Sequence, residues 1–110
     1  MPLVTTNEML KKAQAGHYAV GAFNVENMEM VMAVIKAAEE MNSPVIMQTT
    51  PSTVKYAGLD YYLAMVRTAA ERASVPVAIH LDHGSSFELA MQALRTGYTS
   101  CLLYTSDAAT

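Results

Sequence analysis

The chain has 110 residues and a net charge of −3, with 52% hydrophobic and 15% charged residues. This composition is too apolar for a disordered chain, and without a cluster of Lys and Arg it gives no sign of a nucleic-acid surface. The single cysteine, Cys101, excludes an internal disulfide and a cysteine-based zinc cluster. No signal-peptide pattern begins the chain and no apolar run approaches the ~20 residues of a membrane helix, so we expect a cytoplasmic protein without a membrane partner.

The first predicted element is a helix that starts after Thr5 and ends at Gly16. Thr5 and Glu8 have the spacing of a capping box, in which each side chain bonds the backbone of the other residue. Residues 19–24 follow as an apolar run of strand length, and this run ends at Asn24.

A second helix is predicted to begin at Asn27, whose side chain can accept a hydrogen bond from the first turn. Its apolar residues fall on one face, namely Met28, Val31, Met32, Ile35 and Ala38. The sequence Asn42-Ser43-Pro44 ends this helix, and residues 45–49 form a buried strand. Residues 51–58 are expected to be a loop with a helical turn.

The second half of the chain repeats this alternation. Residues 59–73 are predicted to be a helix, and residues 77–81 a third strand. Residues 82–86 are expected to be a loop, in which Ser86 caps a helix over residues 87–96. A fourth strand is predicted over residues 98–103. We therefore expect four neighbouring parallel strands joined by helices, since this spacing is typical of βαβ units.

Two architectures fit this alternation, a doubly wound open sheet and a (β/α)₈ barrel. The segment Gly21-Ala22-Phe23-Asn24 lacks the glycine spacing of a dinucleotide fingerprint, which counts against a Rossmann sheet. In both architectures, functional sites form at the carboxyl ends of strands. Polar residues gather there in this chain: Asn24, then Gln48, Thr49 and Thr50, then Asp82 and His83.

The most unusual segment is His80-Leu81-Asp82-His83-Gly84, because ionisable groups close an otherwise apolar strand. Alternation places His80 and Asp82 on one face, and His83 turns out at the strand end. Imidazole is the commonest metal ligand near neutral pH, and a neighbouring carboxylate can act as acid or base. The alternative is a structural one, in which Asp82 caps the next helix.

Three segments resemble class II fructose-bisphosphate aldolases and their tagatose-bisphosphate relatives, in order and at family spacing over about residues 1–100. They are Tyr18-Ala19-Val20-Gly21-Ala22-Phe23-Asn24, Ser43-Pro44-Val45-Ile46, and the run from Pro76 through His80-Leu81-Asp82-His83-Gly84 to Glu88. The resemblance implies a (β/α)₈ barrel, of which the first three to four β/α units are present. It also implies a zinc-dependent enzyme that acts on a phosphorylated sugar.

The resemblance assigns roles residue by residue. His83 matches one zinc-binding histidine, and Asp82 matches the catalytic acid/base. Asn24 and Thr50 match positions near the substrate, although many relatives have Ser where this chain has Thr50. His80 matches a histidine that lines the site without binding zinc. The implied reaction is reversible aldol cleavage of fructose or tagatose 1,6-bisphosphate to dihydroxyacetone phosphate and glyceraldehyde 3-phosphate.

The chain departs from the family pattern in two ways. A complete barrel needs roughly 250 residues, and the remaining zinc ligands and phosphate-binding loops lie further along family members. We therefore expect residues 1–100 to be the N-terminal part of the barrel, inactive alone. Residues 101–110 resemble the translation of a sequencing adapter, so we expect them to be a non-native tail.

Two other functions stay open at this point. Some family members are non-catalytic accessory subunits. Another metal-dependent barrel enzyme would use His80 and Asp82 together as ligands on one face. The sequence does not choose between fructose and tagatose bisphosphate, and by resemblance we expect the full-length enzyme to be a homo-oligomer.

Overall fold

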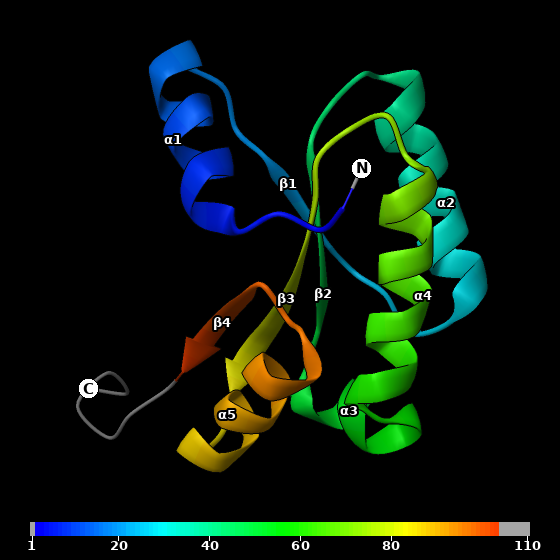
Figure 1. Ribbon diagram of the computed structural model, residues 1–110, viewed down its shortest axis with the longest axis vertical. Helices are drawn as coiled ribbons and strands as arrows, with labels where there is room; N and C mark the ends of the chain where they lie inside the picture. The colour runs from blue at the N-terminus through cyan, green and yellow to red at the C-terminus, as the bar shows by residue number, and fades with distance from the viewer. Residues whose placement is uncertain (1, 104–110) are drawn as a thin grey trace.

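The computed structural model describes residues 2–103, which form a parallel sheet with helices packed on both faces (Figure 1). The strands are β1 (Gly21–Asn24), β2 (Val45–Thr49), β3 (Val77–Gly84) and β4 (Ser100–Leu103). The helices are α1 (Thr6–Gly16), α2 (Met28–Glu40), α3 (Pro51–Ala57), α4 (Leu59–Arg72) and α5 (Phe87–Thr96). The strands lie in the order β1-β2-β3-β4, and each neighbouring pair is parallel. The prediction of four adjacent parallel strands is confirmed.

Two of the predicted helix caps are confirmed. Asn27 accepts a hydrogen bond from the backbone N–H of Met30 at 2.8 Å, and Ser86 accepts one from Leu89 at 3.0 Å. The capping box at the start of α1 is wrong, because the Thr5 side chain occupies the N-cap position without making a cap hydrogen bond. What holds the start of α1 is its contact with the sheet.

Residues 51–57 form the complete helix α3 rather than a loop with one helical turn. Thr50 is its N-cap and accepts a hydrogen bond from the backbone N–H of Thr53. Pro51 occupies the first turn, where its missing N–H costs nothing and its fixed φ already suits a helix. These two local signals outweigh the turn-like composition of the segment.

The larger core lies between one face of the sheet and the layer made by α2, α4 and α5. Side chains that alternate along β2 and β3 point into it, among them Met47, Ile79 and Leu81, each 0% exposed. The helices contribute Val31 and Ala38, then Leu63, Val66 and Ala70, then Ala93. The opposite face carries a second cluster, in which Met9 of α1 packs against Ile46 and Ala78.

The placement of the helices distinguishes the two architectures that the sequence left open. A doubly wound sheet reverses its strand order at a switch point, which sends later helices to the opposite face. Here the order never reverses, and every helix that joins two strands and enters the larger core does so from the same face. Among the helices of residues 2–103, only α1, which precedes β1, covers the other face. This is the winding of a barrel wall.

The predicted apolar face of α2 is only partly right. Val31 and Ala38 are buried, but Met28 and Met32 are 53% and 58% exposed. Val34 instead packs against the core beside Ile35. The helix is therefore rotated so that its aliphatic residues meet the sheet, and the two methionines face outward.

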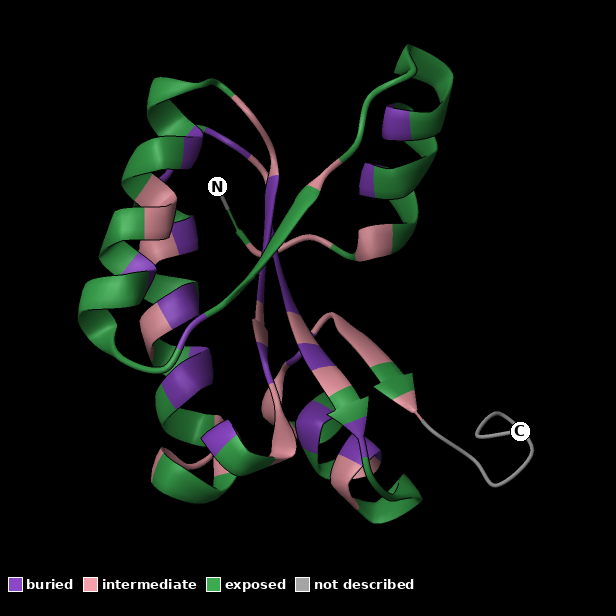
Figure 2. Cartoon of the chain, turned by 180° about the vertical axis from the view of Figure 1, so that it is seen from behind, coloured by how far each residue is buried: buried purple, intermediate pink, exposed green. Residues whose placement is uncertain are grey.

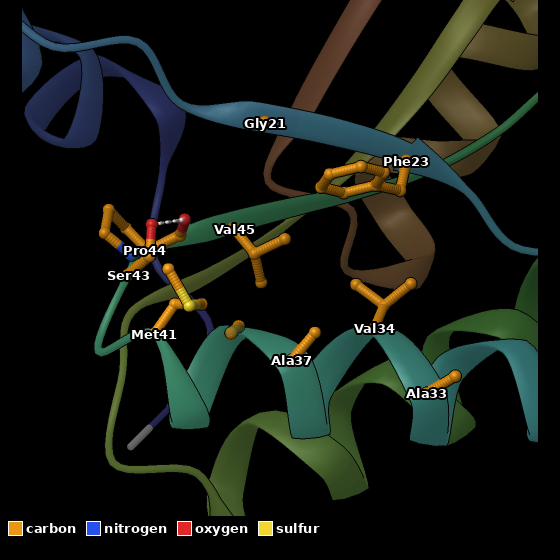
Figure 3. A pocket seen from close by; sticks show the side chains of 10 residues that line it. Gly21, Phe23, Ala33, Val34, Ala37, Met41, Ser43, Pro44 and Val45 are labelled. Carbon is orange, nitrogen blue, oxygen red and sulfur yellow. Dashed lines mark hydrogen bonds between the residues drawn. The ribbon is translucent and has the colours of Figure 1, made fainter.

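β1 is an uncovered edge of the sheet. Its residues are all exposed, as Figure 2 shows, and Phe23 is 51% exposed. Between β1 and α2 lies an apolar groove of about 530 Å³, lined by Phe23, Val34, Ala37 and Pro44 among others (Figure 3). Alternation along β1 puts Phe23 on the α2 side, opposite Asn24. The groove is thus on the other face of the sheet from the polar strand ends.

β3 runs to Gly84, three residues beyond its predicted end at Leu81. The pairing with β4 shifts between Leu81 and Gly84, and His83 adopts a left-handed φ of 55° within this shift. A bulge therefore replaces the predicted loop.

The proposed non-native tail begins inside β4. Cys101 packs against the main core, while residues 104–110 lie outside the described residues. Within residues 2–103 no helix is both long enough and apolar enough to cross a membrane.

Candidate active site

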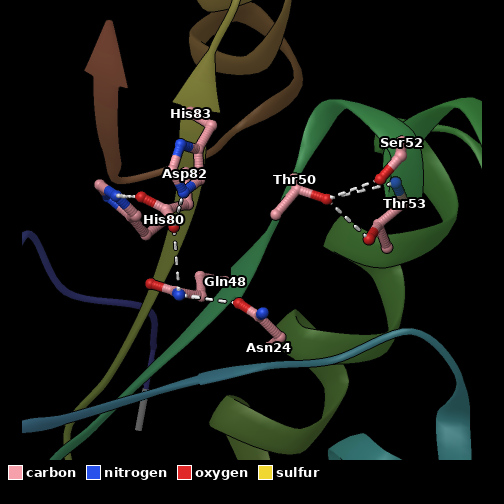
Figure 4. A network of polar contacts seen from close by, with 8 residues as sticks. All are labelled: Asn24, Gln48, Thr50, Ser52, Thr53, His80, Asp82 and His83. Carbon is pink, nitrogen blue, oxygen red and sulfur yellow. Dashed lines mark hydrogen bonds and ion pairs between the residues drawn. The ribbon is translucent and has the colours of Figure 1, made fainter.

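Asn24, Gln48 and Asp82, from the carboxyl ends of β1, β2 and β3, meet on one face of the sheet (Figure 4). The register pairs Asn24 with Gln48 and Gln48 with His80. Asp82 lies two residues beyond His80 and therefore shares its face. This is the face on which α1 covers Ile46 and Ala78. The site is thus a polar extension of the smaller cluster.

Gln48 links the strands across this face. Its Nε2 donates a hydrogen bond to Asn24 Oδ1 at 2.7 Å and a longer one to Asp82 Oδ2 at 3.4 Å. In the sequence alone, Gln48 is visible only as part of a polar strand end, and it is not among the predicted site residues. The register provides the missing signal, because it places Gln48 between Asn24 and His80.

Asp82 lies between two imidazole rings. His80 Nε2 is 3.6 Å from Asp82 Oδ1, and His83 Nε2 is 3.3 Å from Asp82 Oδ2. The side chain of Asp82 is 20% exposed, which leaves the carboxylate partly accessible from the open end of the strands. Asp82 does not cap α5, because Ser86 does so. The prediction that Asp82 caps the next helix is therefore wrong.

His83 turns outward, as predicted. Its side chain is 56% exposed, compared with 17% for His80. The left-handed backbone at His83 interrupts strand alternation, so consecutive residues Asp82 and His83 approach each other through their side chains. This local geometry sets an exposed imidazole beside a partly buried carboxylate.

His80 is held more tightly. Its Nδ1 lies 2.7 Å from the hydroxyl of Ser100, the residue it faces across the β3–β4 pair. Burial lowers the pKa of His80 below 6.5, and the nearby Asp82 carboxylate only partly offsets this effect. Burial therefore favours the neutral form of the ring. With Nδ1 on Ser100 and Nε2 toward Asp82, both nitrogens already have neighbours, which disfavours His80 as a metal ligand.

Thr50 does not join the network of Asn24, Gln48 and Asp82. Its hydroxyl lies 3.1 Å from those of Ser52 and Thr53, so within residues 2–103 its hydrogen bonds stay inside the start of α3. The structure therefore brings together three of the four site residues selected from the sequence, Asn24, Asp82 and His83, and leaves Thr50 in a capping role.

The described residues do not by themselves form a metal site. In residues 2–103 no group of three or more His, Cys, Asp or Glu side chains is arranged to hold a metal ion. The exposed imidazole of His83 suits zinc as a single ligand, but catalytic zinc takes three protein ligands. The remaining donors would have to come from outside these residues.

Comparisons with known proteins agree with this geometry. The sequence model of the family described as Fructose-bisphosphate aldolase class-II matches residues 4–110. The chain is 52% identical over 101 residues to the fructose-bisphosphate aldolase of Thermus caldophilus, covering 92% of this chain and 33% of that protein. It is 42% identical over 106 residues to the 6-phospho-5-dehydro-2-deoxy-D-gluconate aldolase of Halalkalibacterium halodurans, covering 94% of this chain and 37% of that protein.

A solved structure shows the same backbone. The YdjI aldolase from Escherichia coli K12 superposes with a TM-score of 0.84 at 38% identity, over 90% of this chain and 39% of that one. The chain thus spans little more than a third of the relatives it matches, and the predicted fold, the first units of a (β/α)₈ barrel, is confirmed. On the extent of the family match and the similarity to these aldolases, the chain belongs to the class-II fructose-bisphosphate aldolase family.

Proposed function

We propose that this chain is the N-terminal part of a zinc-dependent ketose-bisphosphate aldolase, with Asp82 as its acid/base and His83 as one zinc ligand. The observation that carries the proposal is the Asp82–His83 pair, in which a partly buried carboxylate lies 3.3 Å from an exposed imidazole at the carboxyl end of β3. That end of the strands is where barrel enzymes build their active sites.

The exposure and contacts of the two side chains support this division of roles. His83 presents its ring at the open end of the strands, whereas Asp82 is aligned by Gln48 from the neighbouring strand. A bound zinc ion would supply Lewis-acid polarisation of the substrate ketone. In cleavage, the Asp82 carboxylate takes the proton from the hydroxyl on the carbon that becomes the aldehyde, and it returns this proton in condensation.

Asn24 is proposed to contact the substrate beside Asp82, because Gln48 bonds both side chains and brings them to the same place. Thr50 is the weaker substrate contact, since its hydroxyl is engaged at the start of α3. The substrate is a phosphorylated sugar, fructose or tagatose 1,6-bisphosphate. The full-length enzyme is proposed to be a cytoplasmic homo-oligomer.

The test compares Asp82→Ala with His83→Ala in the full-length protein. His83→Ala should lower bound zinc and cleavage together. Asp82→Ala should keep zinc and lose about 10²–10⁴-fold in cleavage rate, as is typical for a positioned acid/base. Exchange of the dihydroxyacetone phosphate proton with solvent should survive Asp82→Ala better than cleavage does, because that step needs no acid at the aldehyde.

The matched control is His17→Asn, which changes an exposed histidine outside the site. Asn tolerates the left-handed conformation of that position, where φ is 58°. This variant should keep zinc and activity. If Asp82→Ala loses zinc while His83→Ala retains it, the two roles are assigned the wrong way round.

A further inference from the structure

A continuous run of polar contacts joins α1 to the proposed acid/base. Thr6, the first residue of α1, donates a hydrogen bond from its hydroxyl to Ser100 Oγ at 3.2 Å. Ser100, the first residue of β4, lies 2.7 Å from His80 Nδ1. His80 Nε2 in turn lies 3.6 Å from Asp82 Oδ1. Residues 94 positions apart in the sequence therefore act on one imidazole ring.

The direction of the first contact decides where the protons lie. Because Thr6 is the donor, Ser100 Oγ accepts from it and keeps its own single proton for a further partner. His80 Nδ1 is within reach of that proton and can accept it. A neutral imidazole carries one N–H, so acceptance at Nδ1 places the proton on Nε2, which faces Asp82.

The environment of His80 favours the neutral ring, and its neighbours are fixed. Burial lowers the pKa of His80, which favours the form with a single ring proton. Thr6 is held in place because Val4 donates a backbone hydrogen bond to Val77 O at 2.9 Å and Met9 packs in the smaller cluster. The position of the Thr6 hydroxyl is therefore set by the packing of α1 on the sheet.

An Nε2–H that faces Asp82 would align one carboxylate oxygen and leave the other for different partners. At 3.6 Å the contact exceeds an ordinary hydrogen bond, so it acts as a dipole directed at Oδ1. Oδ2 is meanwhile approached by Gln48 and His83. The two oxygens of Asp82 are thus held from different sides, which fixes the plane of the carboxylate.

We propose that Thr6 and Ser100 set the tautomer of His80, so that these three positioning residues orient the Asp82 carboxylate for proton transfer. The proposal rests on the proposed function for its catalytic consequence, but the tautomer itself is a property of the fold. Through this tautomer, α1, which joins no pair of strands, would contribute to the chemistry at the carboxyl end of β3.

The experiment uses the full-length protein with ¹⁵N-labelled histidine and measures the tautomer of His80 by NMR. The unmodified protein should show the Nε2–H tautomer. Ser100→Ala removes the donor and should shift the ring toward Nδ1–H. Ser100→Thr keeps the hydroxyl and should restore the original tautomer. Thr6→Val should give a mixture, because Ser100 is then free to accept from Nδ1–H as well as to donate to it.

Kinetics with fructose 1,6-bisphosphate provide the second readout. Ser100→Ala should lower kcat about 10-fold, at the low end of the roughly 10–100-fold that outer-shell partners contribute, with KM and zinc content unchanged. Ser100→Thr should recover the rate. If Ser100→Ala proves unstable, Thr6→Val tests the same relay without altering β4.

Two results would overturn the proposal: an Nδ1–H tautomer in the unmodified protein, or a tautomer that neither Ser100→Ala nor Thr6→Val changes. Failure of the proposed function is distinguishable from both, since it would appear as an unmodified protein that cleaves no sugar bisphosphate. In that case the tautomer spectra still decide whether the relay exists.

Discussion

A buried hydroxyl pair beneath the site gives a prediction whose magnitude follows from the structure. Thr49, the last residue of β2, and Tyr98, which follows α5, place their hydroxyls 2.8 Å apart. Thr49 is 0% exposed and Tyr98 is 3% exposed, so neither hydroxyl can turn to water. Burial also raises the pKa of Tyr98 to about 12, which keeps its hydroxyl protonated.

Removing both hydroxyls should cost less than the sum of the costs of removing each one alone. Tyr98→Phe leaves the Thr49 hydroxyl buried without its partner, and Thr49→Val does the same to Tyr98. Each single change should lower the free energy of unfolding by about 1–3 kcal/mol. The double variant leaves no orphaned group, so its loss should fall short of the sum of the two by a coupling energy of about 1–3 kcal/mol.

Urea unfolding of the four proteins measures this coupling directly, provided that the slope of the transition stays constant across the set. The reasoning is refuted if the two single losses add to the double loss within about 0.3–0.5 kcal/mol, the usual error of additivity. Such a result would mean that the hydroxyls exchange partners or reach water after one of them is removed.

Other predictions concern the glycines, the buried histidine and the isolated chain. Gly97→Ala should destabilise the fold by about 1–3 kcal/mol, because φ is 130° and the added Cβ would meet Leu63 Cδ2 at 2.9 Å. Thermal unfolding measures this loss. The matched control is Gly16→Ala, because its added Cβ would meet the movable ring of Tyr18. Burial lowers the pKa of His80 below 6.5. The contribution of His80 to the free energy of unfolding should therefore be complete above pH 6.5 and lost as pH falls through the folded-state pKa. His80→Gln should flatten this pH dependence, as measured by urea unfolding at a series of pH values. The purified 110-residue chain should show no aldolase activity and should bind zinc no better than an exposed histidine does, as checked by cleavage assay and metal titration.

The strand pattern could be predicted because each buried strand is bounded by clear breaks. Residues 45–49 were assigned without error, since Pro44 precedes the strand and Pro51 follows it. β1 and β4 were predicted two residues too long at their starts, and the extra residues lie outside the ladders. The proximity of Asn24 and Asp82 could be predicted because polar groups that end apolar strands converge at one edge of a parallel sheet.

The wrong or missing predictions concern contacts between distant segments, which a sequence does not show directly. The bulge in β3 needs β4 in place, because only the shifted pairing between Leu81 and Gly84 gives His83 its left-handed backbone. Thr5 is a suitable residue for a helix cap, but its side chain makes no cap hydrogen bond. α1 is held by its packing on the sheet instead. Ser100 was noted only as part of a strand, since nothing local shows that it faces His80. Register, rather than composition, determines these contacts.

The contacts that align Asp82 and the further donors that a zinc ion would need lie in different parts of the full-length protein. The residues that approach Asp82 come from β2 and β3, so its alignment is complete within this chain. His83, by contrast, is proposed as one donor of a zinc site, and residues 2–103 hold no group of three or more side chains that could complete it. β1 keeps an exposed edge, which in a closed barrel would be covered by a further strand. We therefore expect Asp82 to keep its contacts with Gln48 and His80 when zinc is removed from the full-length protein, whereas the His83 ring should lose its order. Gln48 and His80 are held by strand pairing, while the other donors proposed for the metal are distant in sequence. Histidine NMR before and after chelation of zinc measures the change in the ring signals of both residues. The change should be larger at His83 than at His80. An equally large change at His80 would mean that the metal, and not the sheet, aligns the proposed acid/base.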